Sequence, residues 1–154
     1  MDGGKFLLQL LKIVAGFVLA LIASGLFLAW GFFQAAHPGE NPVAFGAMVG
    51  TGLVAASVAG AAAMLPAGIA IAVAEFARLK GIVFHLAAGG GIAFLIWTLG
   101  PEAGAETGAG GVRPGSVVAL AAGFFAGLVY WIIAGRTAGC WLQGPADPQS
   151  NSEV

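Results

Sequence analysis

The sequence predicts an all-α integral membrane protein, a bundle of four transmembrane helices with both termini on the cytoplasmic side. Three observations lead to this prediction: a very apolar composition, four long apolar segments, and positive charges that gather on one side. Hydrophobic residues make up 59% of the 154 residues and charged residues only 8%, whereas a soluble domain carries about a quarter charged residues. So few charges cannot cover a soluble surface, and we expect lipid to surround much of the chain.

Four segments have the length and composition of membrane spans. A helix needs about 20 apolar residues to cross a hydrocarbon core of about 30 Å. Residues 13–33, 43–74, 81–99 and 116–134 meet this requirement, and none of them contains Asp, Glu, Lys or Arg. Their apolar runs are continuous rather than alternating, and four spans cannot close a barrel, so we expect helices.

Polar and turn-forming residues separate these segments. Residues 37–42 contain two prolines and a glycine, which favour a turn. Glu75, Arg78 and Lys80 mark the second boundary, and residues 100–115 form a Gly-rich loop. The chain therefore divides into one membrane domain, residues 1–142, and a polar tail, residues 143–154, that we expect to be flexible.

The distribution of cations predicts the orientation. With the N-terminus inside, five of the six Lys and Arg residues fall on the cytoplasmic side and only Arg113 falls outside, as the positive-inside rule requires. The tryptophans and the tyrosine agree, because Trp30 and Trp97 reach the outer interface, and Tyr130 and Trp131 the inner one. The alternative for the first span is a cleaved signal peptide, but its apolar run is longer than the usual 7–15 residues.

Small residues predict how the helices pack. In lipid, helices associate through close backbone contact, which small side chains permit. Of the 23 residues in 46–68, 15 are Gly, Ala, Ser or Thr. The predicted packing residues are Gly46, Gly50, Ala56 and Gly60 in the second span, and Ala119, Gly123 and Gly127 in the fourth. We expect the second helix to lie centrally, close against the fourth, with a tilt or a kink at Pro66; the alternative is that a GC-rich genome supplies the small residues.

Three residues are candidates for a polar site. His85 lies about one turn inside the third span, and an ionisable residue within a membrane suggests a function; the alternative is a neutral imidazole bonded to a backbone carbonyl. Glu75 and Arg78, three residues apart, can form an ion pair on a helix, and Glu75 is also a candidate proton or cation site. Gly89, Gly90 and Gly91 predict either a hinge or a close helix crossing, and we favour the crossing.

No pattern in the sequence predicts a catalytic, cofactor or metal site. Haem ligation by His37 and His85 is unfavourable, because the topology places them on opposite sides of the membrane. Four-helix multidrug transporters use a glutamate in their first span, and this first span has none. No Gly-Lys-Ser/Thr follows the glycines of residues 100–115, so they form no P-loop, and no basic patch predicts nucleic-acid binding.

The segment from Tyr130 to Gly139, Tyr-Trp-Ile-Ile-Ala-Gly-Arg-Thr-Ala-Gly, resembles the last span of small, uncharacterised four-helix inner-membrane proteins of Gram-negative bacteria. The match covers about ten residues. It implies a bacterial inner-membrane location and implies no activity.

These observations favour a small non-enzymatic membrane protein. We expect an accessory or assembly subunit of a larger membrane complex, or a homo-oligomer held by small-residue packing, with the bilayer and other membrane subunits or itself as partners. The alternative is a transporter or channel for a proton or a small solute. An enzyme that acts on a lipid or a quinone is a third reading, and the sequence offers it no nucleophile, metal cluster or acid–base pair.

Overall fold

A computed structural model describes residues 3–32, 41–100 and 115–142 of the chain. Four α-helices follow one another: α1 (Gly3–Phe32), α2 (Pro42–Phe76), α3 (Ile82–Leu99) and α4 (Ser116–Ile133). Two short 3₁₀ helices, η1 (Gly135–Thr137) and η2 (Cys140–Leu142), come after α4. Residues 101–114 of the expected loop 100–115, most of the expected turn 37–42 and the expected polar tail lie outside the described residues.

The predicted fold class is confirmed in its main point, since the described residues form an all-helical structure with four helices long and apolar enough to cross a membrane. At about 1.5 Å per residue, the 18 residues each of α3 and α4 reach about 27 Å, close to the thickness of a hydrocarbon core. The helices α1 and α2 are longer, with 30 and 35 residues. They have more length than one straight crossing needs.

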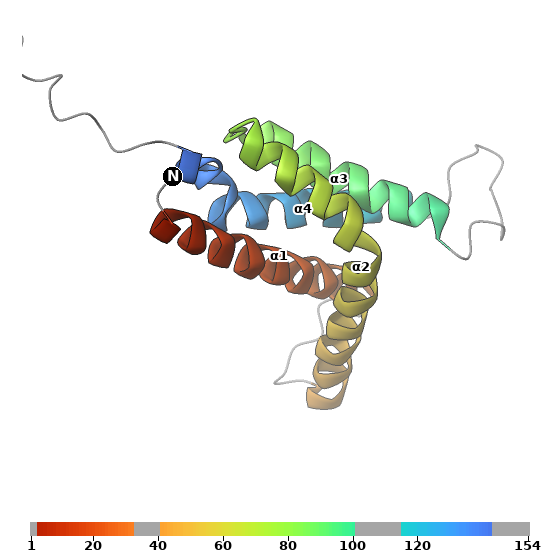
Figure 1. The fold of residues 1–154 in the computed structure, drawn as a ribbon. Helices are drawn as coiled ribbons and strands as arrows, with labels where there is room; N and C mark the ends of the chain where they lie inside the picture. The colour runs from red at the N-terminus through yellow and green to blue at the C-terminus, as the bar shows by residue number, and fades with distance from the viewer. Residues whose placement is uncertain (1–2, 33–40, 101–114, 143–154) are drawn as a thin grey trace, which may run out of the picture.

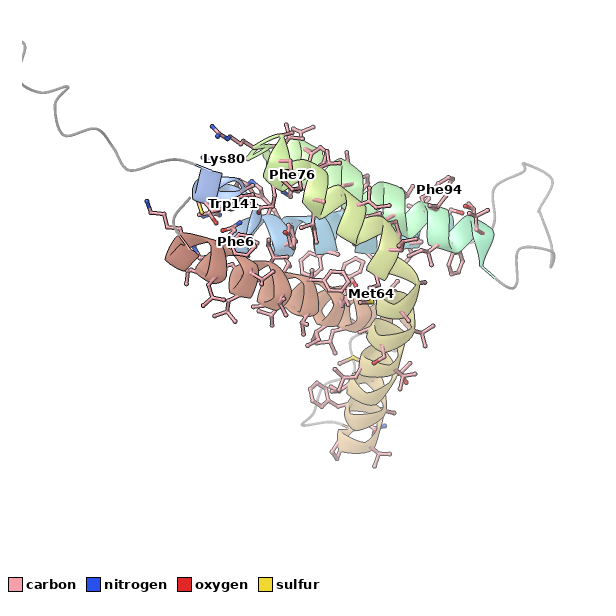
Figure 2. The ribbon with its side chains drawn as sticks, viewed as in Figure 1. Phe6, Met64, Phe76, Lys80, Phe94 and Trp141 are labelled. Carbon is pink, nitrogen blue, oxygen red and sulfur yellow. The ribbon has the colours of Figure 1, made fainter. Side chains whose placement is uncertain are left out.

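The helix α2 bends in its middle. Its second half runs beside α3, and its first half leaves the bundle at a steep angle (Figure 1). Met64 lies at the bend (Figure 2), two residues before the only proline inside the helix, Pro66. Proline cannot donate the usual backbone hydrogen bond, and its ring crowds the carbonyl of the preceding turn. Pro66 therefore accounts for the bend that the sequence predicted as a tilt or a kink.

The first half of α2 crosses α1 at two glycines. A Cβ atom on Gly25 of α1 would strike the carbonyl oxygen of Gly52 and would lie 2.8 Å from the Cβ of Ala56. A Cβ on Gly52 would in turn lie 3.2 Å from the carbonyl oxygen of Gly25. The two backbones are therefore in direct contact, and only glycine lets them approach so closely at this crossing.

A second glycine crossing joins α3 to α4. A Cβ atom on Gly89 would strike the carbonyl oxygen of Gly123 and would lie 3.0 Å from the Cα of Gly127. Gly127 in turn faces the carbonyl oxygen of His85. The helix α3 is unbroken through its three consecutive glycines, so this segment forms a close crossing and not a hinge.

The expected partner of the second helix is wrong. We expected α2 to lie centrally and close against α4, but α2 packs mainly on α1 and less on α3, while α4 packs on α3 and α1. The physical reason is that the small residues of α4 meet those of α3 at the Gly89 crossing. The bend in α2 then carries its first half across the end of α1 (Figure 1).

The α1–α2 crossing gives a direct test. We expect Gly25→Ala to lower the free energy of unfolding by about 1–3 kcal/mol, because a methyl group there overpacks two backbones. Gly50→Ala is the matched control, since nothing lies within 4 Å of a Cβ at that position. Unfolding of detergent-solubilised protein by increasing sodium dodecyl sulfate, followed by circular dichroism, measures the difference. Equal stability of the two variants would contradict the crossing.

Candidate functional site

A cluster of buried polar groups closes one end of the bundle. We call it the end cluster: Gln9, Glu75, Thr137, Gly139 and Trp141. The carboxylate of Glu75 accepts hydrogen bonds from Gln9 Nε2 at 2.6 Å, from the backbone N–H of Gly139 at 2.8 Å and from Trp141 Nε1 at 3.1 Å. Glu75 is only 6% exposed. Such a carboxylate is costly to bury unless donors surround it, and here three do.

The chain reaches this geometry because α2 ends in a tight cap. The backbone N–H of Leu79 bonds to the carbonyl of Ala74 at 2.8 Å and that of Arg78 to the carbonyl of Glu75 at 3.4 Å, which is the Schellman pattern of helix ends. Arg78 takes the left-handed conformation that this cap requires, with φ of 54°. The cap turns the chain away directly after Glu75 and leaves the carboxylate at the bundle end.

The segment after α4 brings the other donors back to Glu75. Gly139 has φ of +71°, and a Cβ there would lie 2.6 Å from Cγ of Arg78 and 3.0 Å from the carbonyl oxygen of Glu75. Both the backbone conformation and the lack of space therefore require glycine. This glycine aims its N–H at the carboxylate and lets Trp141 fold back over it.

The Gln9 amide links the helices α1 and α2 to the C-terminal segment. Its nitrogen donates to Glu75, and its Oε1 accepts from the hydroxyl of Thr137 at 2.8 Å and from the thiol of Cys140 at 3.7 Å. A carboxylate acceptor on one side and hydroxyl and thiol donors on the other allow only one orientation of the amide. Gln9 is 2% exposed, so its position is fixed.

Aromatic rings cover the end cluster. Trp141 meets Phe6 and Phe76 edge to face, with ring centroids 5.4 and 6.0 Å apart. All three rings lie together at the end of the bundle where α1 begins and α2 ends (Figure 2). They shield the hydrogen bonds of Glu75 from the surroundings, which strengthens those bonds.

His85 lies apart from the end cluster and is 5% exposed. Its Nδ1 is 2.9 Å from the carbonyl oxygen of Gly81, and because a carbonyl only accepts, Nδ1 carries the hydrogen. Its Nε2 is buried against Gly135 without a hydrogen-bond partner among the described residues. The ring stacks on Tyr130 at 5.8 Å. This contact with a backbone carbonyl is the one that the sequence offered as the alternative to a functional role for His85.

The structure separates the three residues proposed as a polar site. Glu75 belongs to the end cluster, and His85 bonds to the backbone of its own chain segment. Arg78 lies beyond the last residue of α2, at the left-handed position of the helix cap. Four residues of the end cluster were not predicted from the sequence: Gln9, Thr137, Gly139 and Trp141. The one available signal was Gln9, an isolated amide in the apolar run of residues 6–11.

The predicted packing residues fall into two groups. Ala56, Gly60, Ala119, Gly123 and Gly127 are buried. In contrast, Gly46 and Gly50 are exposed and have nothing within 4 Å of a Cβ position. Gly46 and Gly50 therefore mark a face of α2 that no other described part of the chain covers.

Every Lys and Arg of the described residues lies near the end cluster. Lys5 and Lys12 flank Gln9 on α1, Arg78 and Lys80 follow α2, and Arg136 is in η1. Arg136 lies 4.5 Å from the ring centroid of Trp131, whose indole donates to the carbonyl of Lys80 at 2.9 Å. Glu75 is the single acidic residue in the same ranges, so this end of the described structure is strongly basic.

Comparisons with protein-family models, curated proteins and solved structures find no match to this chain. Within residues 3–32, 41–100 and 115–142, no three His, Cys, Asp or Glu side chains are grouped so that they could hold a metal ion.

Removal of the Glu75 carboxylate tests the end cluster. We expect Glu75→Ala to lower the free energy of unfolding by at least about 2 kcal/mol, because buried donors lose their acceptor. Glu75→Gln keeps the shape and one acceptor oxygen, and we expect a smaller loss. Cys140 is the single cysteine, so its rate of maleimide labelling reports whether the C-terminal segment opens. We expect faster labelling in Glu75→Ala; unchanged stability and labelling would count against the cluster.

A glycine substitution tests the same cluster from the other side. We expect Gly139→Ala to destabilise the protein and to speed Cys140 labelling, because alanine is strained at positive φ and meets Arg78 and Glu75. Gly81→Ala is the control, since its φ is −69° and nothing lies within 4 Å of its Cβ position. Labelling at the same rate in both variants would refute the role given to Gly139.

Proposed function

We propose that this chain is a small non-enzymatic membrane protein that works by helix–helix association. It acts as an accessory or assembly subunit of a larger membrane complex, or as a homo-oligomer. The observation that supports this proposal is the outward face of the bent helix α2, which no other part of the described structure covers.

The outward face follows the helical period. Residues Met48, Gly52, Ala56 and Gly60 of α2 are buried toward α1 and recur every four positions. A strip of residues beside this buried face is wholly exposed. They are Gly46, Gly50, Leu53, Ser57, Ala61, Met64 and Gly68, and we call them the outward face. Their spacing of three and four positions forms one continuous strip along the helix.

The composition of the outward face suits a second helix. Five of its seven residues are Gly, Ala or Ser, and such residues let two backbones approach closely in lipid. Apolar side chains alone contribute little to helix association in lipid, so close approach of the backbones at the small residues is the expected source of affinity. The first half of α2 also stands away from the bundle (Figure 1), which makes both flanks of the strip reachable by a partner.

The proposal includes an orientation and a location. The N-terminal end of α1 and the segment after α4 meet in the end cluster, and the basic residues surround it. By the positive-inside rule we place this end, and both termini with it, in the cytoplasm. The resemblance of residues 130–139 to bacterial proteins supports a location in the inner membrane.

The alternative proposal is a transporter or channel for a proton or a small solute. Its support is the presence of two buried ionisable side chains, Glu75 and His85. Against it, the carboxylate oxygens of Glu75 and Nδ1 of His85 already form hydrogen bonds within the protein. Only Nε2 of His85 has no hydrogen-bond partner among the described residues. Association through the outward face therefore remains the preferred proposal.

Site-directed crosslinking tests the association. In a Cys140→Ser background, the thiol introduced by Gly50→Cys is labelled with a benzophenone maleimide and native membranes are irradiated. We expect crosslinked adducts, because position 50 lies on the outward face and this reagent needs no cysteine in the partner. Ala62→Cys is exposed on the same helix but lies off that strip, and we expect little adduct there. An adduct of twice the chain mass indicates a homo-oligomer, and a heavier or lighter adduct indicates a different subunit. A monomer at both positions would refute the proposal.

A further inference from the structure

A cavity of about 230 Å³ lies inside the bundle. All four helices contribute to its walls, including α2 and α4, the two helices that the sequence predicted to pack directly on each other. On α3 the lining extends from Phe84 to Trp97, which corresponds to about 20 Å along the helix. The cavity is therefore elongated along the bundle and only partly enclosed.

Small side chains on two facing helices create this space. Ala63, Ala67 and Ala70 line it from α2, spaced so that they share one helix face, and Ala122 and Ala126 line it from α4. Side chains that end at Cβ cannot reach across the gap between the two helices. The cavity thus results from the same small residues that would otherwise permit tight packing.

The lining is almost wholly apolar and offers water few partners. The Ser24 hydroxyl donates to the carbonyl of Leu21 at 3.0 Å, and Nδ1 of His85 is bonded to Gly81. His85 Nε2 is turned against Gly135 and has no accessible surface. A buried water needs two to four polar partners, so water is a poor occupant along most of this length.

We propose that the cavity is a binding site for the hydrocarbon chain of a bilayer phospholipid. Hydrocarbon is the solvent around helices of this composition, it has no hydrogen bonds to lose in an apolar slot, and a single chain has the elongated shape of the cavity. The cavity is partly open, so a chain can enter while its headgroup stays outside. This inference does not depend on the proposed association.

A photoreactive phospholipid tests the site. The full-length chain, purified in maltoside detergent, receives phosphatidylcholine with a diazirine in one acyl chain, is irradiated, and is then digested for mass spectrometry. We expect crosslinks on the lining residues of α2 and α4 near Ala63 and Ala122. Phosphatidylglycerol with the same chain should give the same crosslinks, because the site holds the chain and not the headgroup.

Matched leucine substitutions provide the control. Ala63→Leu fills the cavity and should reduce the crosslink yield several-fold. Ala62→Leu, the same change at an exposed position outside both the cavity lining and the outward face, should leave the yield unchanged. Ala122→Leu fills the cavity from α4 and replaces Ala63→Leu if circular dichroism and gel filtration show that the latter is misfolded. Crosslinks on exposed faces alone, equal yields in filled and wild-type protein, or labelling by one headgroup only would overturn the proposal.

Discussion

Close backbone contact at glycine is the interaction on which this fold depends. In hydrocarbon, apolar side chains gain little by leaving lipid for protein, so helices must be held by dense packing and polar contacts. Two backbone contacts at glycine provide the dense packing in the described helices: Gly25 with Gly52, and Gly89 with Gly123. The first fastens α2 to α1 and the second fastens α3 to α4, and the contact between α1 and α4 joins the two pairs into one bundle.

The end cluster adds hydrogen bonds between distant parts of the chain, which the glycine contacts do not provide. A carboxylate buried at a bundle end accepts from a side chain of α1 and from the backbone and indole of the C-terminal segment. Two parts of the chain that are remote from Glu75 in sequence, the start of α1 and the segment after α4, are thereby bonded to it. Because burial makes an unpaired donor or acceptor costly, these groups hold one arrangement rather than several.

One structural cause underlies both surfaces that we connect with function. The bend near Pro66 divides α2 into two halves. The first half leaves the bundle and exposes the outward face (Figure 1), while the second half runs along the bundle without packing on α4. The association surface and the cavity lining thus lie on different sides of this bent helix, and both consist mainly of small residues. In lipid, a small side chain leaves room either for another backbone or for a hydrocarbon chain.

The sequence alone determined the number of helices, their apolar character and the bend at Pro66, because each depends on local composition and on the length of uninterrupted apolar runs. It also identified Glu75 and His85 as ionisable residues within or beside the membrane spans. Only the tertiary structure decided which helices touch. Gly46-xxx-Gly50 and Gly123-xxx-Gly127 have the same spacing, and yet among the described helices only the second is packed against a neighbour. The hydrogen-bond partners of Glu75 could not be predicted from the sequence either, since Gln9 and Gly139 lie 66 and 64 residues away from it. Spacing along a helix fixes which residues share a face, whereas the direction that the face takes depends on the whole bundle.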